Sequence, residues 1–181
     1  SANSLPRDIE LFKGDDGEYY IYTTPSPELT ALRGKEKKYG SFNISGRNVT
    51  KKLPEDAHGL YEINMKIDVA KNADIILGNA EGDKVVMRYD TQKRTFSMDR
   101  RKSGIVDFSS DFPCITTAPI SADHQQTLRL FIDRSSIEAF DGDGHFVMTN
   151  LVFPHQPYTT LSIHADGQGK VKDLVSWNIK Y

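Results

Sequence analysis

Two carboxylate residues on either side of a short turn are the first candidates for chemistry in this sequence. Asp133 and Glu138 flank Arg134-Ser135-Ser136, so a hairpin here would bring the two side chains near each other. Carboxylates held about 5–9 Å apart are the groups that hydrolyse glycosidic bonds. In the alternative interpretation, Asp133 accepts backbone hydrogen bonds in the turn and Glu138 pairs with a cross-strand arginine. Because Glu138 alternates with Ile137 and Ala139, either face of this strand can be the buried one.

Other patterns that could support catalysis or ligand binding are weaker. Asp141-Gly142-Asp143-Gly144-His145 resembles part of a calcium loop, but it lacks the third acidic position and the distal glutamate, so a hairpin turn is the better interpretation. No Gly-x-Ser-x-Gly nucleophile elbow is present, and Gly78 to Gly82 is typical of a turn rather than of a phosphate-binding loop. The histidines show neither the i, i+4 spacing of a helical zinc site nor cysteine partners; they are His58, His124, His145, His155 and His164. We therefore expect no cofactor and no metal ion in this chain, whereas composition leaves a Ser/His/Asp arrangement open.

Composition narrows the function further. The chain has 181 residues, 38% of them hydrophobic and 27% charged, which is ordinary for a soluble globular domain. Its formal net charge of -2 offers no strong field to recruit nucleic acid or an anionic membrane, and the basic clusters Lys35 to Lys38 and Arg100 to Lys102 are interpreted as solvated loops. No apolar stretch approaches the roughly 18 residues of a membrane span. The start at Ser1 without methionine is what an excised fragment would show, in which case a targeting segment is cut away.

The elements that must position these residues are strands. Leu60 to Val69 and Leu128 to Asp133 alternate apolar and polar residues with the period of two that a half-buried strand needs, and Val85 to Tyr89, Thr160 to His164 and Val171 to Ile179 follow the same pattern. Turns rich in aspartate and glycine, at 81–83, 141–144 and 166–169, separate them. We expect one all-β domain over residues 1–181, a sandwich of two antiparallel sheets.

Several local expectations follow from this pattern. The segment from Ser103 to Ala122 contains two prolines and is interpreted as a long crossover between the sheets. Trp177 shares a strand face with Val175 and Ile179, so we expect it in the core. The tyrosines Tyr19, Tyr20 and Tyr22 are better candidates than Trp177 for an exposed ring that stacks on a ligand, although aromatic rings in strands usually pack inside the protein.

Three ordered motifs resemble a known family. Leu128 to Phe140 (LRLFIDRSSIEAF) resembles the Asp-Arg-Ser-Ser-(Val/Ile)-Glu-x-Phe strand pair of glycoside hydrolase family 32, which contains invertases, levanases and inulinases. Asp99 to Gly104 (DRRKSG) is similar to an Asp-Arg-x-x-Ser-Gly segment of the same module, and Ala165-Asp166-Gly167 fits the turn before the last strand. The motifs span residues 99 to 167, and the first half matches only in its strand pattern.

The resemblance implies a two-part enzyme. A five-bladed N-terminal propeller would carry the catalytic aspartate nucleophile and glutamate acid, and a C-terminal sandwich of concanavalin A-like, jelly-roll fold would pack against it. This chain resembles only the second part, because the propeller's motifs are missing: Arg7-Asp8 is followed by Ile9 rather than proline, the single Cys114 follows Pro113 rather than glutamate, and no Asn-Asp-Pro occurs. No catalytic residue is carried over onto this chain.

Three functions stay open at this point. The module supports the propeller of the same polypeptide, which would leave an apolar patch exposed on the isolated fragment. Alternatively it binds fructan, with Asp133, Arg134 and Glu138 as the first carbohydrate-binding candidates beside an exposed ring. In the third case it is an independent hydrolase or a lectin unrelated to fructans, which would need two close carboxylates, one of raised pKa, in a cleft. A homodimer is a further option. Polymeric substrates favour a place outside the cytoplasm, although a cytoplasmic sucrose hydrolase fits the motifs equally; the choice among levan, inulin and sucrose belongs to the propeller.

Overall fold

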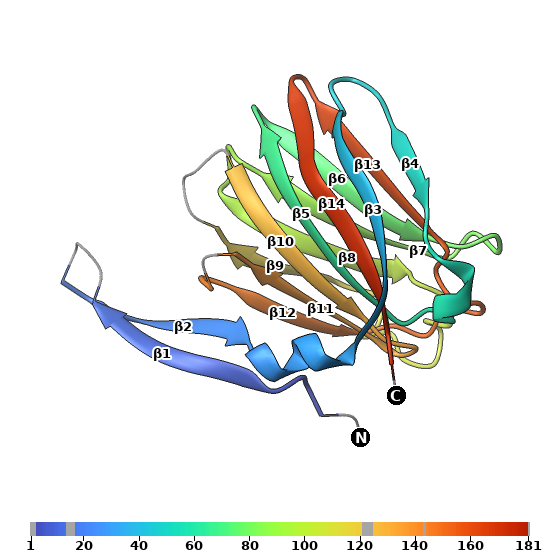
Figure 1. Cartoon of the computed structure of the whole chain (residues 1–181), viewed down its shortest axis with the longest axis horizontal. Coiled ribbons are helices and arrows are strands. Elements are labelled where there is room, and N and C mark those ends of the chain that lie inside the picture. The colour runs from blue at the N-terminus through green and yellow to red at the C-terminus, as the bar shows by residue number, and fades with distance from the viewer. Residues whose placement is uncertain (1–2, 14–16, 121–124, 143, 181) are drawn as a thin grey trace.

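Two six-stranded antiparallel sheets form the body of the molecule, and a two-stranded arm projects from it (Figure 1). The computed structural model describes residues 3–13, 17–120, 125–142 and 144–180. The strands in this part of the chain are β1 (Arg7–Lys13), β2 (Tyr19–Pro25), β3 (Arg33–Asn43), β4 (Val49–Lys52), β5 (Tyr61–Val69), β6 (Asn72–Gly78), β7 (Lys84–Asp90), β8 (Thr95–Lys102), β9 (Ile115–Pro119), β10 (Gln125–Ile132), β11 (Ser136–Asp141), β12 (Val147–Leu151), β13 (Thr160–Asp166) and β14 (Gly169–Ile179). Two short 3-10 helices, η1 (Pro27–Leu32) and η2 (Glu55–Ala57), connect them.

The strand order places neighbours in space that are distant in sequence. One sheet has the order β12-β11-β10-β5-β14-β3, and the other has the order β4-β13-β6-β7-β8-β9. The hydroxyl of Tyr39 on β3 donates to the carbonyl of Lys52 on β4 at 3.0 Å, so these two edge strands lie on the same side of the sandwich. Asn150 on β12 donates to the hydroxyl of Thr116 on β9 at 2.8 Å, so the other two edge strands share the opposite side.

The core lies between the sheets and consists of the inward-facing residues of both. Ile63 and Ile67 of β5 and Ile75 and Leu77 of β6 are completely buried there, as their alternation with polar residues predicts. The ring of Phe96 packs between Tyr89 and Phe146, with ring centroids 4.9 and 4.8 Å apart. Apolar area removed from water supplies most of the stability of such a core, roughly 25 cal/mol per Å².

The expected fold class is confirmed. All five segments with alternating residues form strands, namely β5, β7, β10, β13 and β14. The turns around Gly82 and Gly167 join β6 to β7 and β13 to β14, and both glycines have positive φ, as tight hairpins require. The turn after Asp141 joins β11 to β12, and Asp143 within this turn lies outside the described residues. The same is true of His124, which precedes β10.

The expectation that Trp177 lies in the core is wrong. Asp173 on β14 has a φ of 55° and the pairing of β14 with β5 shifts between Lys172 and Val175, so the strand contains a bulge. A bulge inserts an extra residue and thereby exchanges the two faces of the strand beyond it. Ser176 consequently points into the core, while Trp177 is half-buried on the outer face, under the guanidinium of Arg33 at 4.0 Å from the ring centroid.

Two further expectations are corrected. The segment from Ser103 to Ala122 is no simple crossover between sheets, because it contains β9, which pairs with β8 in the same sheet; the change of sheet comes only between β9 and β10. The basic clusters 35–38 and 100–102 lie in β3 and β8 rather than in loops. Lysines on β3 serve an edge strand, where charge discourages pairing with another molecule. No helix in the described part of the chain is long and apolar enough to cross a membrane.

Candidate functional site

Glu138, the predicted sugar-binding glutamate, lies on the outer face of β11 and is only 4% exposed. The segment before β1 crosses this face and covers it. Its carboxylate accepts a hydrogen bond from the backbone N–H of Leu5 at 2.7 Å, one from the guanidinium of Arg7 at 2.7 Å and one from the hydroxyl of Thr149 at 3.2 Å. The charge is therefore neutralised by Arg7, an arginine 131 residues away in the sequence.

A second buried glutamate, Glu62 on β5, lies on the same outer face. It forms a bidentate pair with Arg33, with N–O distances of 2.7 and 2.6 Å, and accepts a further bond from Nε of Arg129 at 2.7 Å. The hydrogen bonds that Arg33 donates to Glu62 raise the pKa of the Arg33 guanidinium above its ordinary value. Buried carboxylates that are paired in this way hold chain segments together, because separating the pair would leave an uncompensated charge.

A cavity of about 160 Å³ is lined both by the two glutamates and by the N-terminal segment. Its apolar lining comes from Leu5, Leu29, Leu32, Leu60, Phe131, Ile132 and Ile179, and its polar lining comes from Asn3, Arg33, Glu62, Asp133, Ser136 and Glu138. The cavity does place Asp133 and Glu138 on one wall. However, both glutamates are occupied by arginines, and the aromatic ring in the lining, Phe131, is itself buried. The arrangement suits anchoring of the N-terminal segment better than proton transfer.

Asp133 and Arg134 are exposed, and the structure does not bring Arg134 to Glu138. The side chain of Asp133 accepts the backbone N–H of Arg134 at 2.6 Å, and its own N–H donates to the carbonyl of Ser136 at 2.9 Å, as a turn aspartate does. Arg134 instead lines a different hollow, of about 190 Å³, together with Asp133, His58, His155 and Gln156.

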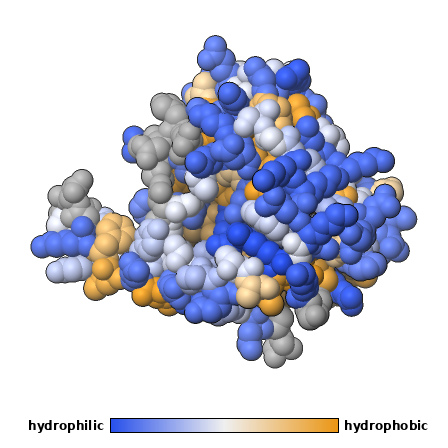
Figure 2. Space-filling model, in the orientation of Figure 1, coloured by the Kyte–Doolittle hydropathy of each residue, from blue (hydrophilic) through white to orange (hydrophobic). Residues whose placement is uncertain are grey.

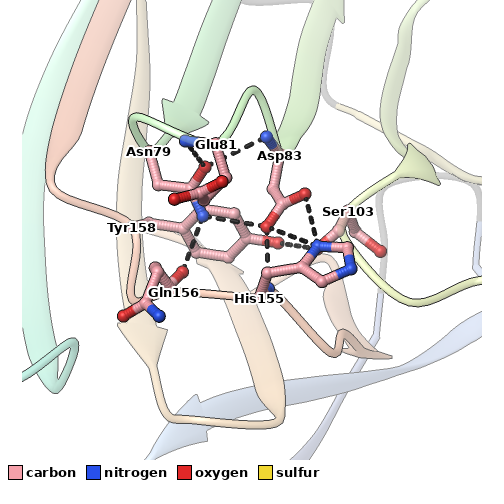
Figure 3. A network of polar contacts seen from close by, with 7 residues as sticks. All are labelled: Asn79, Glu81, Asp83, Ser103, His155, Gln156 and Tyr158. Atoms are coloured by element: carbon pink, nitrogen blue, oxygen red, sulfur yellow. Dashed lines mark hydrogen bonds and ion pairs between the residues drawn. The ribbon is translucent and has the colours of Figure 1, made fainter.

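Behind this hollow lies a polar network that the sequence did not indicate (Figure 3). Asp83 accepts bonds from the backbone N–H of His155 at 2.7 Å and from the side-chain amide of Asn79 at 2.9 Å, and it lies 3.0 Å from Nδ1 of His155. Burial opposes the charge of Asp83, but the hydrogen bonds from Asn79 and His155 outweigh it and lower the pKa of this carboxyl. The hydroxyl of Tyr158 donates to the carbonyl of Ser103 at 2.7 Å, and burial raises the pKa of Tyr158.

No local signal could have revealed this network, because Asp83 and His155 are 72 residues apart. It joins the β6–β7 turn to the segment between β12 and β13. The pKa values of three carboxyl groups in the described residues, those of Glu28, Asp83 and Asp99, are lowered from their ordinary values. Within the same part of the chain, no cluster of three histidine, cysteine, aspartate or glutamate side chains could hold a metal ion.

The two-stranded arm, β1 paired with β2, carries the most exposed large apolar residues in the part of the chain that the structure describes. Residues directly opposite in the pairing share a face. Ile9, Leu11, Tyr19 and Ile21 therefore share one face, and each is between 63% and 69% exposed. In Figure 2 the arm projects at the left of the body, and orange, apolar surface lies along it.

The opposite face of the arm is packed only in part. Phe12 stacks on Tyr20 with ring centroids 5.5 Å apart, and Tyr22 lies so close to Gly144 that a Cβ there would collide with its ring. Of the three tyrosines considered for ligand stacking, Tyr19 and Tyr20 are exposed and Tyr22 is half-buried. A two-stranded ribbon is marginal on its own in water. An apolar face on such a ribbon indicates a surface that another part of a protein covers.

Comparison with known proteins agrees with the fold and with the motifs. Residues 28–178 match the family model described as glycosyl hydrolases family 32 C terminal. A levanase of Bacillus subtilis (strain 168) is 32% identical over 189 residues, which cover 99% of this chain and 27% of the levanase. An extracellular exo-inulinase of Aspergillus niger is 40% identical over 68 residues, which cover 36% of this chain and 13% of that protein.

Solved structures show the same sandwich. The crystal structure of exo-inulinase from Aspergillus awamori superposes with a TM-score of 0.78 at 20% identity, covering 97% of this chain and 35% of that one. A β-fructofuranosidase from Schwanniomyces occidentalis gives a TM-score of 0.77 at 17% identity, covering 98% of this chain and 40% of that one. The chain thus spans about a quarter to two fifths of these longer proteins.

Proposed function

The chain belongs to the C-terminal domain family of glycosyl hydrolases family 32, and from this membership we propose that residues 1–181 form a non-catalytic module that packs against the catalytic propeller of a fructan- or sucrose-hydrolysing enzyme. The observation that carries the proposal is the apolar face of the arm. Exposed Ile9, Leu11 and Ile21 would lower the solubility of the isolated chain and contribute nothing to its stability. Burial of these side chains against a second domain would stabilise both partners.

The anchoring of the arm supports the same role. The arm is attached to the sandwich through the pair of Arg7 with Glu138, through the bond from the N–H of Thr23 to the carbonyl of Gly144 at 3.0 Å, and through an apolar cluster of Leu29, Phe131 and Phe140. A rigid attachment fixes the position of whatever packs on the arm relative to the sandwich. The glutamate of the family motif is in this proposal a structural anchor.

The test uses the two-part polypeptide, in which this module follows its catalytic part. We expect the unmodified polypeptide to unfold thermally in one transition and the variant Leu11→Glu/Ile21→Glu to unfold in two, because the charges on the arm prevent its burial. The isolated chain should hydrolyse neither levan, inulin nor sucrose. A single transition at an unchanged temperature in the variant, or hydrolysis by the isolated chain, contradicts the proposal.

Fructan binding is the second candidate, and one observation favours it. Two of the three predicted residues, Asp133 and Arg134, line the same solvent-open hollow with His58 and Gln156, which offers several hydrogen-bonding groups for vicinal hydroxyls. Calorimetric titration with levan-type and inulin-type oligosaccharides, with cellulose oligomers as control, tests this candidate. Heat confined to the fructans that disappears in Arg134→Ala supports it, and no heat from a folded chain removes it.

The compartment and the partners of the polypeptide are part of the same proposal. The substrate of the whole polypeptide would be a fructoside. If that substrate is a polymer, a location outside the cytoplasm fits it, and the Aspergillus niger relative is named an extracellular enzyme. A homodimer is the alternative use of the exposed apolar surfaces, and sedimentation of the isolated chain over a range of concentrations distinguishes the two.

A further inference from the structure

A second apolar surface lies on the loop between β8 and β9, far in sequence from the arm. Phe108, Phe112 and Phe153 form a three-ring cluster with centroid distances of 4.6, 5.6 and 5.4 Å, and Ile105 binds it through a backbone bond from its N–H to the carbonyl of Phe153 at 2.8 Å. Phe108 is 58% exposed and Ile105 is 46% exposed. We call these four residues the ring platform.

The ring platform is held in place by the family motif Asp99 to Gly104. The guanidinium of Arg100 lies 4.2 Å from the centroid of Phe112 and donates to the carbonyl of Leu151 at 3.2 Å. Gly104 has a φ of 128°, and a Cβ there would overlap the carbonyl of Phe153. The motif therefore fixes the rings of the platform, through Arg100 at Phe112 and through Gly104 at Phe153. Rings fixed rigidly at a surface lose little entropy when a partner covers them.

The two long sides of the sandwich differ in how their edges are protected. The edge strands β3 and β4 carry six lysines and arginines, at positions 33, 35, 37, 38, 51 and 52. Their counterparts β9 and β12 contain no charged residue, and each exposes an apolar side chain, Ile115 and Leu151. Natural sheets protect free edges with lysine unless something covers them. This difference indicates that the β9–β12 side is a covered side.

The ring platform and the arm meet the same strand, β12. The guanidinium of Arg7, at the root of the arm, donates to the hydroxyl of Thr149 at 2.7 Å, and Arg100, beneath the platform, donates to the carbonyl of Leu151. Thr149 and Leu151 are two residues apart on this strand, so the two arginines contact β12 within one repeat of its backbone. A domain that packs on the arm is thereby brought next to the platform.

We infer that the ring platform is a second docking surface for the catalytic part of the same polypeptide, so that the catalytic part contacts the module at two places, the arm and the β8–β9 loop. The inference rests on the proposed function for its partner. Two separated contacts resist rotation of one domain about the other more strongly than a single contact does.

The experiment substitutes Phe108→Glu in the two-part polypeptide and in the isolated chain. The matched control is Lys35→Gln on the opposite edge, which changes the net charge by the same amount at a side chain 79% exposed. In the isolated chain, both variants should keep the unfolding temperature within a few degrees, because both side chains are largely exposed. In the two-part polypeptide, we expect Phe108→Glu to raise the rate of proteolytic cleavage between the parts at least five-fold and Lys35→Gln to leave it unchanged.

The outcomes separate this inference from the proposed function. If Leu11→Glu/Ile21→Glu accelerates cleavage and Phe108→Glu does not, the arm docks the catalytic part and the ring platform does not. If neither variant has an effect, both proposals fail. If the isolated chain sediments as a dimer that Phe108→Glu dissociates, with no effect in the two-part polypeptide, the platform binds a second copy and the inference is overturned.

Discussion

Glu138→Ala tests the assignment of the motif glutamate as an anchor of the arm. The substitution removes the acceptor of three hydrogen bonds and leaves the guanidinium of Arg7 without its carboxylate. Removing one partner of a buried ion pair typically costs about 3–5 kcal/mol. The side chain of Arg7 is 22% exposed, so water rehydrates part of its charge, and we reduce the expected cost to about 2–3 kcal/mol.

The cost should appear first as release of the arm root, because the carboxylate connects that segment to β11. Amide hydrogen exchange measures the release directly, at the N–H of Leu5, bonded to Glu138, and of Ser26, bonded to the carbonyl of Pro6. A cost of 2–3 kcal/mol corresponds to exchange about 30- to 150-fold faster. Glu138→Gln keeps the shape and one acceptor oxygen and should show a smaller increase. The exposed Glu81→Ala is the control.

The result that would refute this reasoning is equally specific. If Glu138→Ala leaves exchange at the arm root within the range of the control and instead abolishes calorimetric heat with fructan oligosaccharides, the carboxylate serves a ligand and the pair with Arg7 is incidental. A double-mutant cycle with Arg7→Ala gives an independent value, and a coupling energy below about 0.5 kcal/mol would also contradict the anchor.

Three further predictions concern the sandwich itself. The pKa of Asp83 is lowered in the folded state, so its contribution to the free energy of unfolding is complete above the ordinary value of about 3.8 and is lost as the pH falls through the lower folded value. Asp83→Asn should therefore weaken the decrease of the free energy of unfolding with falling pH, measured by urea titrations at pH 2–5. An unchanged decrease would exclude the network as its source. Gly104→Ala should lower the free energy of unfolding by more than about 2 kcal/mol, since it adds a collision with Phe153 to the strain of positive φ. Gly167→Ala, which has open space around its Cβ, should lower it by only about 1 kcal/mol. Equal losses of the two variants in chemical denaturation would contradict the collision. Leu130→Ala, completely buried between the sheets, should lower the free energy of unfolding by about 2–5 kcal/mol, and a loss below 1 kcal/mol would show a core that collapses around the gap.

Local patterns predict the strands well because the alternation of apolar and polar residues in a strand is visible in consecutive residues of the sequence. β5 begins within one residue of its expected start for this reason. Trp177 was assigned to the wrong face because the bulge at Asp173 depends on an aspartate in a conformation that its sequence neighbours do not reveal. The same limit applies to the segment from 103 to 122, where β9 is too short and too irregular in its alternation to stand out.

The candidate site was predictable only in part. The family motif drew attention to Asp133, Arg134 and Glu138, and the structure places the first as a turn residue, the second on an open hollow and the third beneath the N-terminal segment. Whether any of them contacts a sugar stays a prediction. The role of Glu138 depends on Arg7, and that of Asp83 depends on His155, partners that only the folded chain brings together.

The position of β14 has a consequence for how the chain is made. This strand follows all the others in the sequence, yet it lies between β5 and β3, and β3 has no other hydrogen-bonded neighbour in its sheet. During synthesis, β3 and β5 must therefore wait with unpaired edges until residue 179 has left the ribosome tunnel, and the lysines of β3 reduce the risk of aggregation meanwhile. A nonsense mutation shortly before Gly169 would not trim the module at its end; it would leave a four-stranded sheet, β12-β11-β10-β5, and separate β3 from it without a partner strand.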